Sequence, residues 1–376
     1  MSEIVLVNAA LANGAAGNIA IDAGVISEAG DSAAGRKIDC AGMVLFPGFI
    51  DVHNHGAVGV DVNEAKVEGL IAVGEFLARN GVTAWVPTLV PDSDENYARA
   101  IGEIDRLMEI QAEMPVAQAV GVHYEGVFAN EQMCGALRPQ YFKRFTGTEV
   151  ESLPRLKSGV HMTTFAPEVE GGVELAAELT RRGWIASIGH TRADAQTLDR
   201  AFAAGARHVT HFFNAMSGVH HRDIGVAGWA LSNPDVTFDI IADGIHVHPR
   251  MLALACRTKT PDRTLLISDS VAPTGLGDGE FDLWGERITV ESGRTRNERG
   301  SIAGSVITMR DAVMMAGSLG FSNAEIAEMA AANPAHLLGI DRERGLLEAG
   351  KRADIVGLKA DGEVGLIVIG GRIVDI

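Results

Sequence analysis

Residues 47–56 read Pro-Gly-Phe-Ile-Asp-Val-His-Asn-His-Gly, an apolar run that ends in two histidines one residue apart. Side chains two residues apart in an extended strand point to the same side. His53 and His55 can therefore direct two imidazoles at one point, as a metal site requires. The run predicts a buried strand with metal ligands at its end.

Further candidate ligands follow other short apolar runs. Glu125, His190, His211 and Asp269 each come at the end of a segment that predicts a strand. A buried carboxylate is costly unless it is paired or bound to a metal. Carboxylates and imidazoles at the ends of successive strands are typical of a metal hydrolase built on a barrel.

The middle of the chain alternates predicted helices with predicted strands. The helices are expected at 68–80, 97–113, 172–182, 194–204 and 249–256. The strands are expected at 82–88, 116–121, 184–188, 206–210, 236–241 and 264–267. Such alternation indicates parallel β/α architecture. Because the polar residues cluster at the carboxyl ends of the strands, a closed barrel is favoured over an open sheet.

Both ends of the chain are rich in short β segments. Residues 4–7 and 17–26 predict hairpins near the start, and 353–358 and 365–374 repeat this pattern near the end. The simplest arrangement is one small β domain, formed by 1–47 and 349–376, beside a central domain at 48–348.

The composition fits a large enzyme rather than a nucleic-acid-binding or membrane protein. The chain has 376 residues, of which 47% are hydrophobic, and a net charge of −17 that would repel a phosphate backbone. Cys40, Cys134 and Cys256 form no paired motif, so no disulfide framework is expected. No secretory leader and no apolar run long enough to span a bilayer are recognised. We expect a cytoplasmic enzyme.

Three further positions suggest roles in the chemistry. Asp269 could take a proton from an attacking water and return it to a departing amine; a helix N-cap or a plain loop residue is the alternative interpretation. Residues 212–216 with Arg222 could form an anion cradle from backbone amides and a guanidinium. His246 could polarise a carbonyl or hold a substrate hydroxyl. His220, His221 and His248 are weaker candidates for a role in the site.

A series of motifs in a fixed order carries a resemblance to a known family. The motifs are Pro47–Asp51, His123–Gly126, Gly189–Thr191, His211–Met216, Ala242–His246, Ser268–Asp269, Ala303–Ser305, Asn333–Ala335, Gly345 and Gly350–Asp354. Together they resemble the amidohydrolase superfamily and, more narrowly, the N-acetylglucosamine-6-phosphate deacetylase family. The resemblance covers nearly the whole chain and implies a (β/α)8 TIM-like barrel with a small β-sandwich made by both termini.

The resemblance also implies roles for single residues. Glu125, His190 and His211 would hold the main divalent metal, and His53 and His55 a second ion where one is present. Asp269 would be the general base and acid, and His246 would help to polarise the acetyl carbonyl. Asn214, Ala215 and Arg222 would bind the sugar phosphate. Zinc is the expected metal, with iron, manganese and cobalt as alternatives, and a homodimer is the expected assembly.

The chain departs from the family pattern on the substrate side. Val127 stands where the family usually has proline, and Asp223-Ile224 replaces a usual Glu-Pro pair. Leu137 stands where a histidine usually reaches the sugar hydroxyls, and leucine cannot form that hydrogen bond. A site that loses such a partner loses discrimination among substrates. The metal and base positions therefore support the deacetylation chemistry more strongly than the identity of the sugar.

Three functions follow from these residues. The first is hydrolysis of N-acetylglucosamine-6-phosphate to glucosamine-6-phosphate and acetate. The second is hydrolysis of another N-acyl amino sugar or small amide, or of a cyclic amide or lactone by a related metal hydrolase. Many of those relatives bridge two metals with a carboxylated lysine, a place that Glu125 fills here. The third is an inactive scaffold, which the complete set of candidate ligands disfavours.

Overall fold

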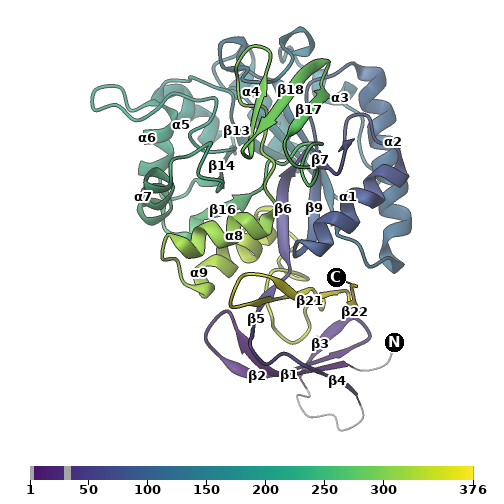
Figure 1. Cartoon of the computed structure of the whole chain (residues 1–376). Coiled ribbons are helices and arrows are strands. Elements are labelled where there is room, and N and C mark those ends of the chain that lie inside the picture. The colour runs from purple at the N-terminus through teal and green to yellow at the C-terminus, as the bar shows by residue number, and fades with distance from the viewer. Residues whose placement is uncertain (1–3, 29–34, 376) are drawn as a thin grey trace.

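The computed structural model describes residues 4–28 and 35–375. It consists of a large barrel with a small β domain at one end and a three-stranded sheet near the opposite end (Figure 1). The first and last described segments of the chain both lie in the small β domain. The expected fold class, a TIM-like barrel with a small β domain from both termini, is thereby confirmed.

Parallel strands form the barrel. They are β6 (Phe49–Asn54), β9 (Val82–Leu89), β10 (Gln118–Ala119), β11 (Gly121–Phe128), β12 (Val160–Phe165), β13 (Ile185–Ile188), β14 (His208–Val209), β15 (Thr237–Ile241) and β16 (Thr264–Ile267). Strand β6 pairs with β9, and the sheet then runs in chain order from β11 to β16. The ring closes between its last and first strands, because Asp269 N–H donates to His53 O at 3.0 Å and His55 N–H donates to Ser270 O at 2.8 Å.

Helices cover the outside of the barrel. They are α1 (Val67–Arg79), α2 (Asp94–Ile110), α3 (Glu149–Ser152), α4 (Gly172–Arg181), α5 (Ala195–Ala203), α6 (Gly225–Ser232), α7 (Pro249–Lys259), α8 (Met309–Ser318), α9 (Asn323–Ala327) and α10 (Asn333–Leu337). Short 3₁₀ turns lie at Gln111–Glu113, Glu131–Met133, Pro139–Tyr141 and Pro261–Arg263, and a π turn lies at Glu328–Ala332.

Capping side chains fix several helix starts. Ser93 accepts from Asn96 N–H at the start of α2, and Asp194 accepts from Thr197 N–H at the start of α5. Thr308 at the start of α8 forms a reciprocal capping box with Asp311. The polar residues that precede these helices are therefore the reason why each helix begins where it does.

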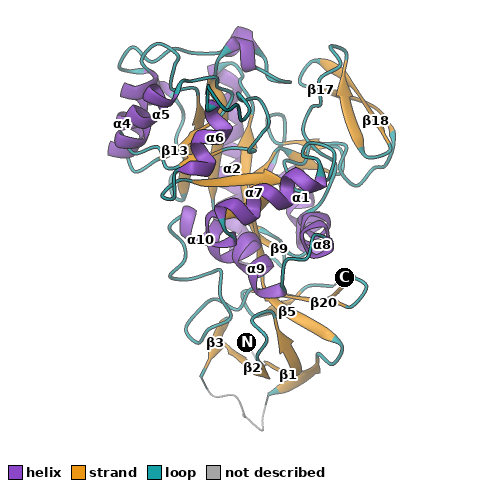
Figure 2. Ribbon diagram, turned by 90° about the vertical axis from the view of Figure 1, so that its left-hand side faces the viewer, coloured by secondary structure: helices purple, strands orange, loops and turns teal. Residues whose placement is uncertain are grey.

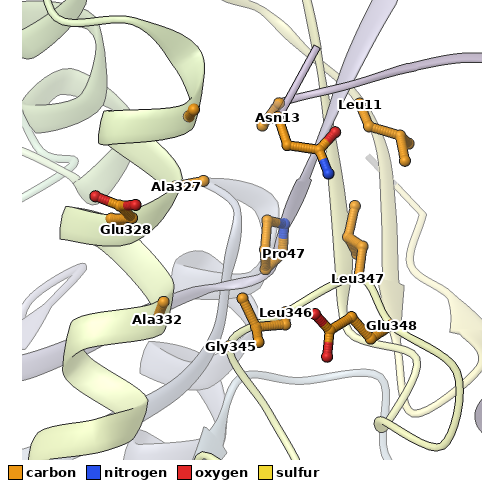
Figure 3. A pocket seen from close by; sticks show the side chains of 12 residues that line it. Leu11, Asn13, Pro47, Ala327, Glu328, Ala332, Gly345, Leu346, Leu347 and Glu348 are labelled. Carbon is orange, nitrogen blue, oxygen red and sulfur yellow. The ribbon is translucent and has the colours of Figure 1, made fainter. Parts of the chain in front are cut away.

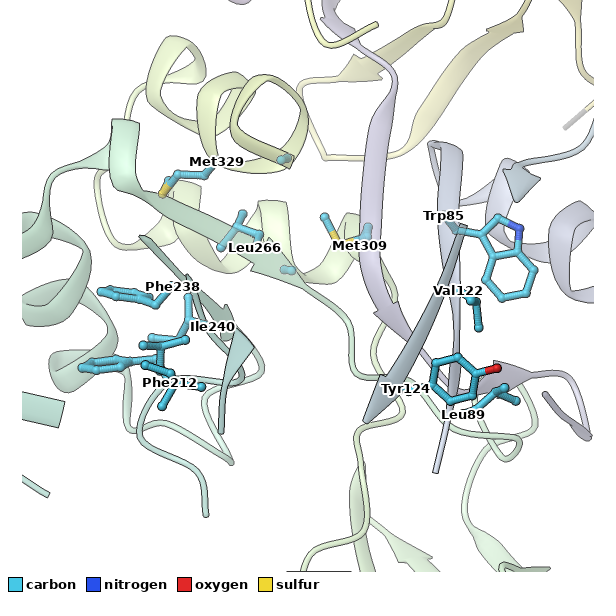
Figure 4. Close-up of a cluster of buried hydrophobic side chains, with 14 of the residues drawn as sticks. Trp85, Leu89, Val122, Tyr124, Phe212, Phe238, Ile240, Leu266, Met309 and Met329 are labelled. Carbon is cyan, nitrogen blue, oxygen red and sulfur yellow. The ribbon is translucent and has the colours of Figure 1, made fainter. Parts of the chain in front are cut away.

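The main hydrophobic core lies between the barrel strands and the helices. Every residue of β6, β9 and β11 is buried, as expected for parallel strands covered on both faces. Trp85, Val122 and Tyr124 gather on one side of the barrel (Figure 4). On another side the rings of Phe212 and Phe238 stack with centroids 4.2 Å apart. This packing fixes the strands whose ends carry the polar residues.

The small domain joins segments from opposite ends of the chain. Its strands are β1 (Ile4–Leu11), β2 (Ala16–Asp22), β3 (Val25–Ser27), β4 (Arg36–Asp39), β5 (Met43–Pro47), β20 (Ile355–Lys359), β21 (Val364–Ile369) and β22 (Arg372–Ile373). The antiparallel pair β5–β20 connects the two segments. A cavity of about 160 Å³ lies at the junction with the barrel, between Pro47, Ala332 and Leu346 (Figure 3).

Several elements were not among the predicted ones. Strand β12, helices α6 and α8–α10, the short pair β7 (Gly56–Ala57) and β8 (Val60–Asp61), and the sheet β17 (Gly279–Leu283), β18 (Glu286–Glu291) and β19 (Arg294–Asn297) are additions. The strand expected at 116–121 is also longer. It continues as β11 to Phe128, with an irregular register beyond Tyr124, so Glu125 lies within the strand rather than after it.

Candidate metal centre and active site

The candidate site lies at the carboxyl ends of the barrel strands. His53 belongs to β6 and Glu125 to β11, while His190, His211 and Asp269 follow β13, β14 and β16. Each of these last three has a positive φ, of 47°, 32° and 51° respectively. Residues other than glycine rarely adopt this conformation, and such strain gathers at functional sites. The backbone therefore turns at each strand end to direct one polar side chain inward.

Two groups of buried side chains converge there. His53, His55 and Asp269 form the first group, and the second is Glu125, His190 and His211. Within each group, one donor atom per residue lies within 4.8 Å of the others. The structure thus brings together all five residues predicted as metal ligands, with the predicted base beside them.

Glu125 lies between the two groups. Its Oε1 is 2.9 Å from His190 Nε2 and 3.0 Å from His211 Nε2, while its Oε2 is 3.3 Å from His55 Nε2. Asp269 Oδ1 lies 3.4 Å from His53 Nε2 and 3.3 Å from His55 Nε2. One carboxylate therefore touches both groups, and the other belongs to the first.

Hydrogen bonds at Nδ1 of two histidine rings show that their Nε2 atoms are available as metal ligands. His55 Nδ1 lies 3.2 Å from Thr88 O, and His190 Nδ1 lies 2.8 Å from Met133 O. A carbonyl oxygen can only accept, so each ring donates from Nδ1 and its neutral form presents a lone pair at Nε2. Such anchoring is typical of metal-ligating histidines.

The donor set fits a divalent cation. The Nε2 atoms of His53 and His55 face each other at 3.1 Å, and those of His190 and His211 lie 3.0 Å apart. Facing imidazole nitrogens of this kind are brought together by a shared proton or a shared cation. Nitrogen and carboxylate ligands in this number suit zinc and the neighbouring transition metals.

Charges within the cluster strongly perturb its titration. Burial alone would raise the pKa of Glu125, but the charge of His53 and hydrogen bonds from His190 and His211 hold it well below its usual range. Burial would lower the pKa of His55, yet the bonds and charges of Asp269 and Glu125 raise it to about 10. The carboxylates thus stay ionised and attract positive charge, either protons or a metal ion.

The predicted catalytic residues are both held in place. The backbone of Asp269 is fixed on both sides, because its N–H donates to His53 O and its carbonyl accepts from Ser305 N–H at 2.7 Å. His246 donates from Nδ1 to Asp243 Oδ2 at 2.6 Å. Burial would raise the pKa of Asp243, but the hydrogen bond and charge of His246 lower it. This contact fixes the ring and leaves Nε2 for a substrate.

A cavity of about 300 Å³ opens above the two groups. Its lining includes the predicted Leu137, Asn214, Ala215 and His246 together with His55, Glu125, His190, His211 and Asp269. Arg222 is not part of this lining. It lies on an exposed loop, where its guanidinium contacts the His221 ring at 2.6 Å.

The loop after β14, predicted as an anion cradle, has an alternating backbone conformation. His211, Phe213 and Ala215 have φ of 32°, 78° and 49°, alternating with residues of ordinary φ. Three N–H groups of this loop are already used within the protein, because those of His211 and Phe212 donate to Asp239 and that of Asn214 donates to His211 O at 2.9 Å. Thr191 N–H donates to Ala215 O at 3.1 Å and ties this loop to the His190 loop.

Two residues near the site were not predicted from the sequence. Glu168 accepts hydrogen bonds from the Thr191 hydroxyl, from Arg192 N–H at 2.7 Å and from Asn130 Nδ2 at 2.8 Å, so it holds the loop that carries His190. Trp284 lines the cavity from the β17–β18 turn, and its ring centroid is 5.3 Å from that of His55. Neither residue stands in a recognisable motif, and only the fold brings them to the site.

Comparison with known proteins agrees with this architecture. A profile of the amidohydrolase family matches residues 44–374. The chain belongs to the amidohydrolase family. The N-acetylglucosamine-6-phosphate deacetylase of Bacillus subtilis (strain 168) is 34% identical over 337 residues, which are 89% of this chain and 85% of that protein. The N-acetylgalactosamine-6-phosphate deacetylase of Escherichia coli O157:H7 is also 34% identical, over 88% of this chain and 87% of that protein.

Solved structures of this amidohydrolase group share the whole fold. The N-acetylglucosamine-6-phosphate deacetylase of Pasteurella multocida superposes with a TM-score of 0.90 at 26% identity, covering 99% of both chains. An aspartate-to-alanine variant of the Mycobacterium smegmatis enzyme, in complex with N-acetyl-D-glucosamine-6-phosphate, has a TM-score of 0.88 at 28% identity and covers all of both chains. This chain is thus a metal-dependent hydrolase of amide bonds by family.

Proposed function

We propose that the protein removes the acetyl group of N-acetylglucosamine-6-phosphate, giving glucosamine-6-phosphate and acetate. The observation that carries this proposal is the convergence of Asp269 with the Glu125, His190 and His211 group beneath one cavity. N-acetylglucosamine-6-phosphate deacetylases that are 34% identical over most of the chain support it. No lysine lines the cavity among the residues that the structure describes, which disfavours a hydrolase with a carboxylated lysine.

The residues of the chain divide the reaction between them. Glu125, His190 and His211 would hold the main ion, with His53 and His55 available for a second. A divalent ion in this place supplies an electrophile for the acetyl carbonyl and lowers the pKa of water. Asp269 takes the proton of the attacking water at its carboxylate and then delivers it to the departing nitrogen. His246 donates from Nδ1 to Asp243, so it can polarise the carbonyl oxygen only as an imidazolium that also donates from Nε2.

The phosphate would bind at the loop after β14. The position of Asn214 and Ala215 in the lining of the cavity supports this assignment. Arg222 could complete this phosphate site from the exposed loop or from a second copy of the chain.

We also propose zinc as the ion, a homodimer as the assembly and the cytoplasm as the location. The exposed apolar side chains Val219 and Ile224 near Arg222 support the homodimer. No described helix has the length and apolar character needed to cross a membrane.

A second candidate function differs from the first in the sugar epimer of the substrate. The N-acetylgalactosamine-6-phosphate deacetylase matches the chain as well as the gluco enzyme does, at 34% identity. Leu137 lines the cavity where the family resemblance expects a histidine for the sugar hydroxyls. Hydrolysis of N-acetylgalactosamine-6-phosphate is therefore the second candidate function.

The decisive experiment measures acetate release by protein loaded with Zn²⁺ or Mn²⁺. The substrates are N-acetylglucosamine-6-phosphate, its galacto and manno epimers, and unphosphorylated N-acetylglucosamine. We expect kcat/KM above about 10⁴ M⁻¹s⁻¹ for the gluco phosphate and a large loss without the phosphate. A preference for the galacto epimer would select the second candidate. No acetate from any of the four would overturn both.

A further inference from the structure

One wall of the cavity is a short segment of the connection between β11 and β12. The Leu137 segment, residues 134–138, joins two 3₁₀ turns, and residues 135–137 line the cavity. Leu137 is 3% exposed and lies directly over Gly126, because a Cβ added to that glycine would be 2.2 Å from Leu137 Cδ1. Since Gly126 follows Glu125 in the chain, the place of this segment sets the space beside the metal-binding groups.

A fork of hydrogen bonds from Arg138 fixes the end of the Leu137 segment. Arg138 donates from Nε to Pro91 O at 3.1 Å and from Nη2 to Asp92 Oδ2 at 2.7 Å. The guanidinium also lies over the ring of Tyr141, 5.0 Å from its centroid. The side chains of Arg138 and Asp92 are 18% and 8% exposed. A charge-assisted pair that is largely shielded from water holds its two elements together more firmly than an exposed pair does.

Asp92 is itself anchored, at the turn from β9 to α2. It accepts hydrogen bonds from Ser93 N–H at 2.8 Å, from Asn63 Nδ2 at 3.2 Å and from Asn96 Nδ2 at 2.6 Å. Burial would raise the pKa of Asp92, but hydrogen bonds from its neighbours and the charge of Arg138 lower it. The carboxylate is therefore ionised at neutral pH, and the pair ties the cavity wall to the start of α2.

The opposite side of the Leu137 segment is held more loosely. Strands β17 and β18 stand at the end of the barrel away from the small domain (Figure 2). Arg299, just after β19 of the same sheet, donates from Nη2 to Ala136 O at 3.3 Å. Its side chain is exposed, so water competes for this bond. Ala136 and Trp284 also pack against one small apolar cluster. The Asp92–Arg138 pair is thus the more buried of the two ties.

We propose that Arg138 is a positioning residue for substrate binding, which acts through Asp92 on the Leu137 segment. The proposal rests on the proposed deacetylase function and deepens it, because it names the pair that holds one wall of the substrate cavity. The metal-binding loop has a separate tie, since Met133 O accepts from His190 Nδ1 at 2.8 Å. Loss of the pair should therefore release the wall and leave the metal ligands in place. The substrate must then order the wall when it binds, which raises KM and leaves kcat nearly unchanged.

The test measures KM and kcat for acetate release by metal-loaded wild type, Arg138→Gln, Arg138→Lys and Asp92→Asn. The substrate is whichever of the gluco and galacto N-acetylamino sugar 6-phosphates the wild type hydrolyses faster. We expect KM to rise at least about fivefold in Arg138→Gln and in Asp92→Asn, with kcat and metal content close to wild type. Arg138→Lys keeps the charge but has no fork, so its KM should lie between those of wild type and Arg138→Gln.

A matched control and a double variant isolate the pair. Arg144→Gln removes the same charge from the same connection, but Arg144 forms only an exposed pair with Glu131, at 3.9 Å, so its KM should match wild type. The double variant Asp92→Asn with Arg138→Gln should have the KM of either single variant to within about twofold. Hydrogen exchange of residues 131–141 gives a measurement that does not depend on activity. It should become faster in Arg138→Gln, because Leu137 N–H donates to Cys134 O within this segment.

An unchanged KM in Arg138→Gln would overturn the proposal, and so would an equal rise in Arg144→Gln. A loss of metal and of kcat as large as the rise in KM would also overturn it, since Arg138 would then support the ligands rather than the wall. If Arg138→Gln does not fold, the KM of Arg138→Lys decides. Failure of the proposed function would look different, because the wild type would then release no acetate from either sugar, while hydrogen exchange would still report on the wall.

Discussion

The two ends of the barrel each bury histidine, but they use it differently. At the carboxyl end, His190 and His211 turn Nε2 toward each other and toward Glu125. At the opposite end, His161 near the start of β12 stacks on Trp184 with centroids 4.7 Å apart and accepts from Leu156 N–H at 3.0 Å. Burial alone therefore does not mark a ligand. Ring nitrogens that converge on one another and on a shared carboxylate do.

The largest effect is expected from Glu125, because it touches both groups of ligands. Glu125→Gln keeps the shape but removes the charge that faces four imidazoles. We expect loss of bound metal and a fall in kcat/KM of at least about 10³-fold. Metal content by elemental analysis, together with acetate release, checks this. If the variant kept its full metal content, Glu125 would not be needed to hold the metal. The contrast between the histidines at the two ends of the barrel would then fail.

Asp269→Asn should separate proton transfer from metal binding. Asparagine cannot accept the proton of the attacking water, so kcat should fall by about 10²–10⁴-fold. The ion held by Glu125, His190 and His211 should remain, because Asp269 is not a member of that group. Steady-state kinetics and metal analysis on the same sample measure both effects. A kcat within tenfold of wild type would remove Asp269 from its role.

Glu168 offers a smaller effect that acts through position. Glu168→Gln loses the charge that gathers Asn130, Thr191 and Arg192 around the His190 loop. We expect metal affinity and activity to fall by about 10–100-fold, with little change in the unfolding temperature. The control is Glu170→Gln, two residues further along the chain, because Glu170 lines the same surface pocket as Glu168. Equal losses of metal affinity and activity in both variants would mean that the effect comes from removing a negative charge in this region, and not from the hydrogen bonds of Glu168.

The smallest effect concerns His161 and should leave activity unchanged. Burial, with the nearby charge of Arg155, lowers the pKa of His161 from 6.5 to about 4. Between these values the unfolded chain binds a proton that the folded protein does not, so stability falls as the pH drops from 6.5 toward 4. His161→Gln keeps an acceptor for Leu156 and removes this titration. Its unfolding midpoint should fall about 1–2 °C less than that of wild type between pH 7 and pH 5.5.

Thermal unfolding scans at the two pH values measure the His161 effect. If His161→Gln lost activity as well, the end of the barrel away from the cavity would share in the chemistry. The contrast drawn between ligand and core histidines would then be wrong.

The β/α alternation could be predicted because each strand and helix is a local pattern. The predicted helices and strands mostly match α1, α2, α4, α5, α7 and the strands between them to within a few residues. The metal-binding groups could also be predicted, since parallel strands bring their carboxyl ends to one place. The catalytic and binding roles of those residues stay predictions until the variants are measured.

The features missed from sequence depend on contacts distant along the chain. Strand β12 begins after a segment without clear periodicity, and the sheet β17–β19 is an insertion with no part in the alternation. Trp284 reaches His55 across more than two hundred residues of sequence, so no local pattern connects them. Glu168 holds the His190 loop in place by hydrogen bonds, and such a role leaves no recognisable pattern of residue types in the sequence.

The closure of the ring through His53 and Asp269 has a consequence for the growing polypeptide. Synthesis proceeds from the amino terminus, so Glu125, His190 and His211 are all present well before Asp269. His53 and His55 appear early but wait for the last strand to give them their carboxylate neighbour. A nascent chain arrested before β16 therefore contains the candidate ligands Glu125, His190 and His211 but lacks Asp269. We therefore expect a chain truncated before β16 to be inactive whether or not it binds a metal ion.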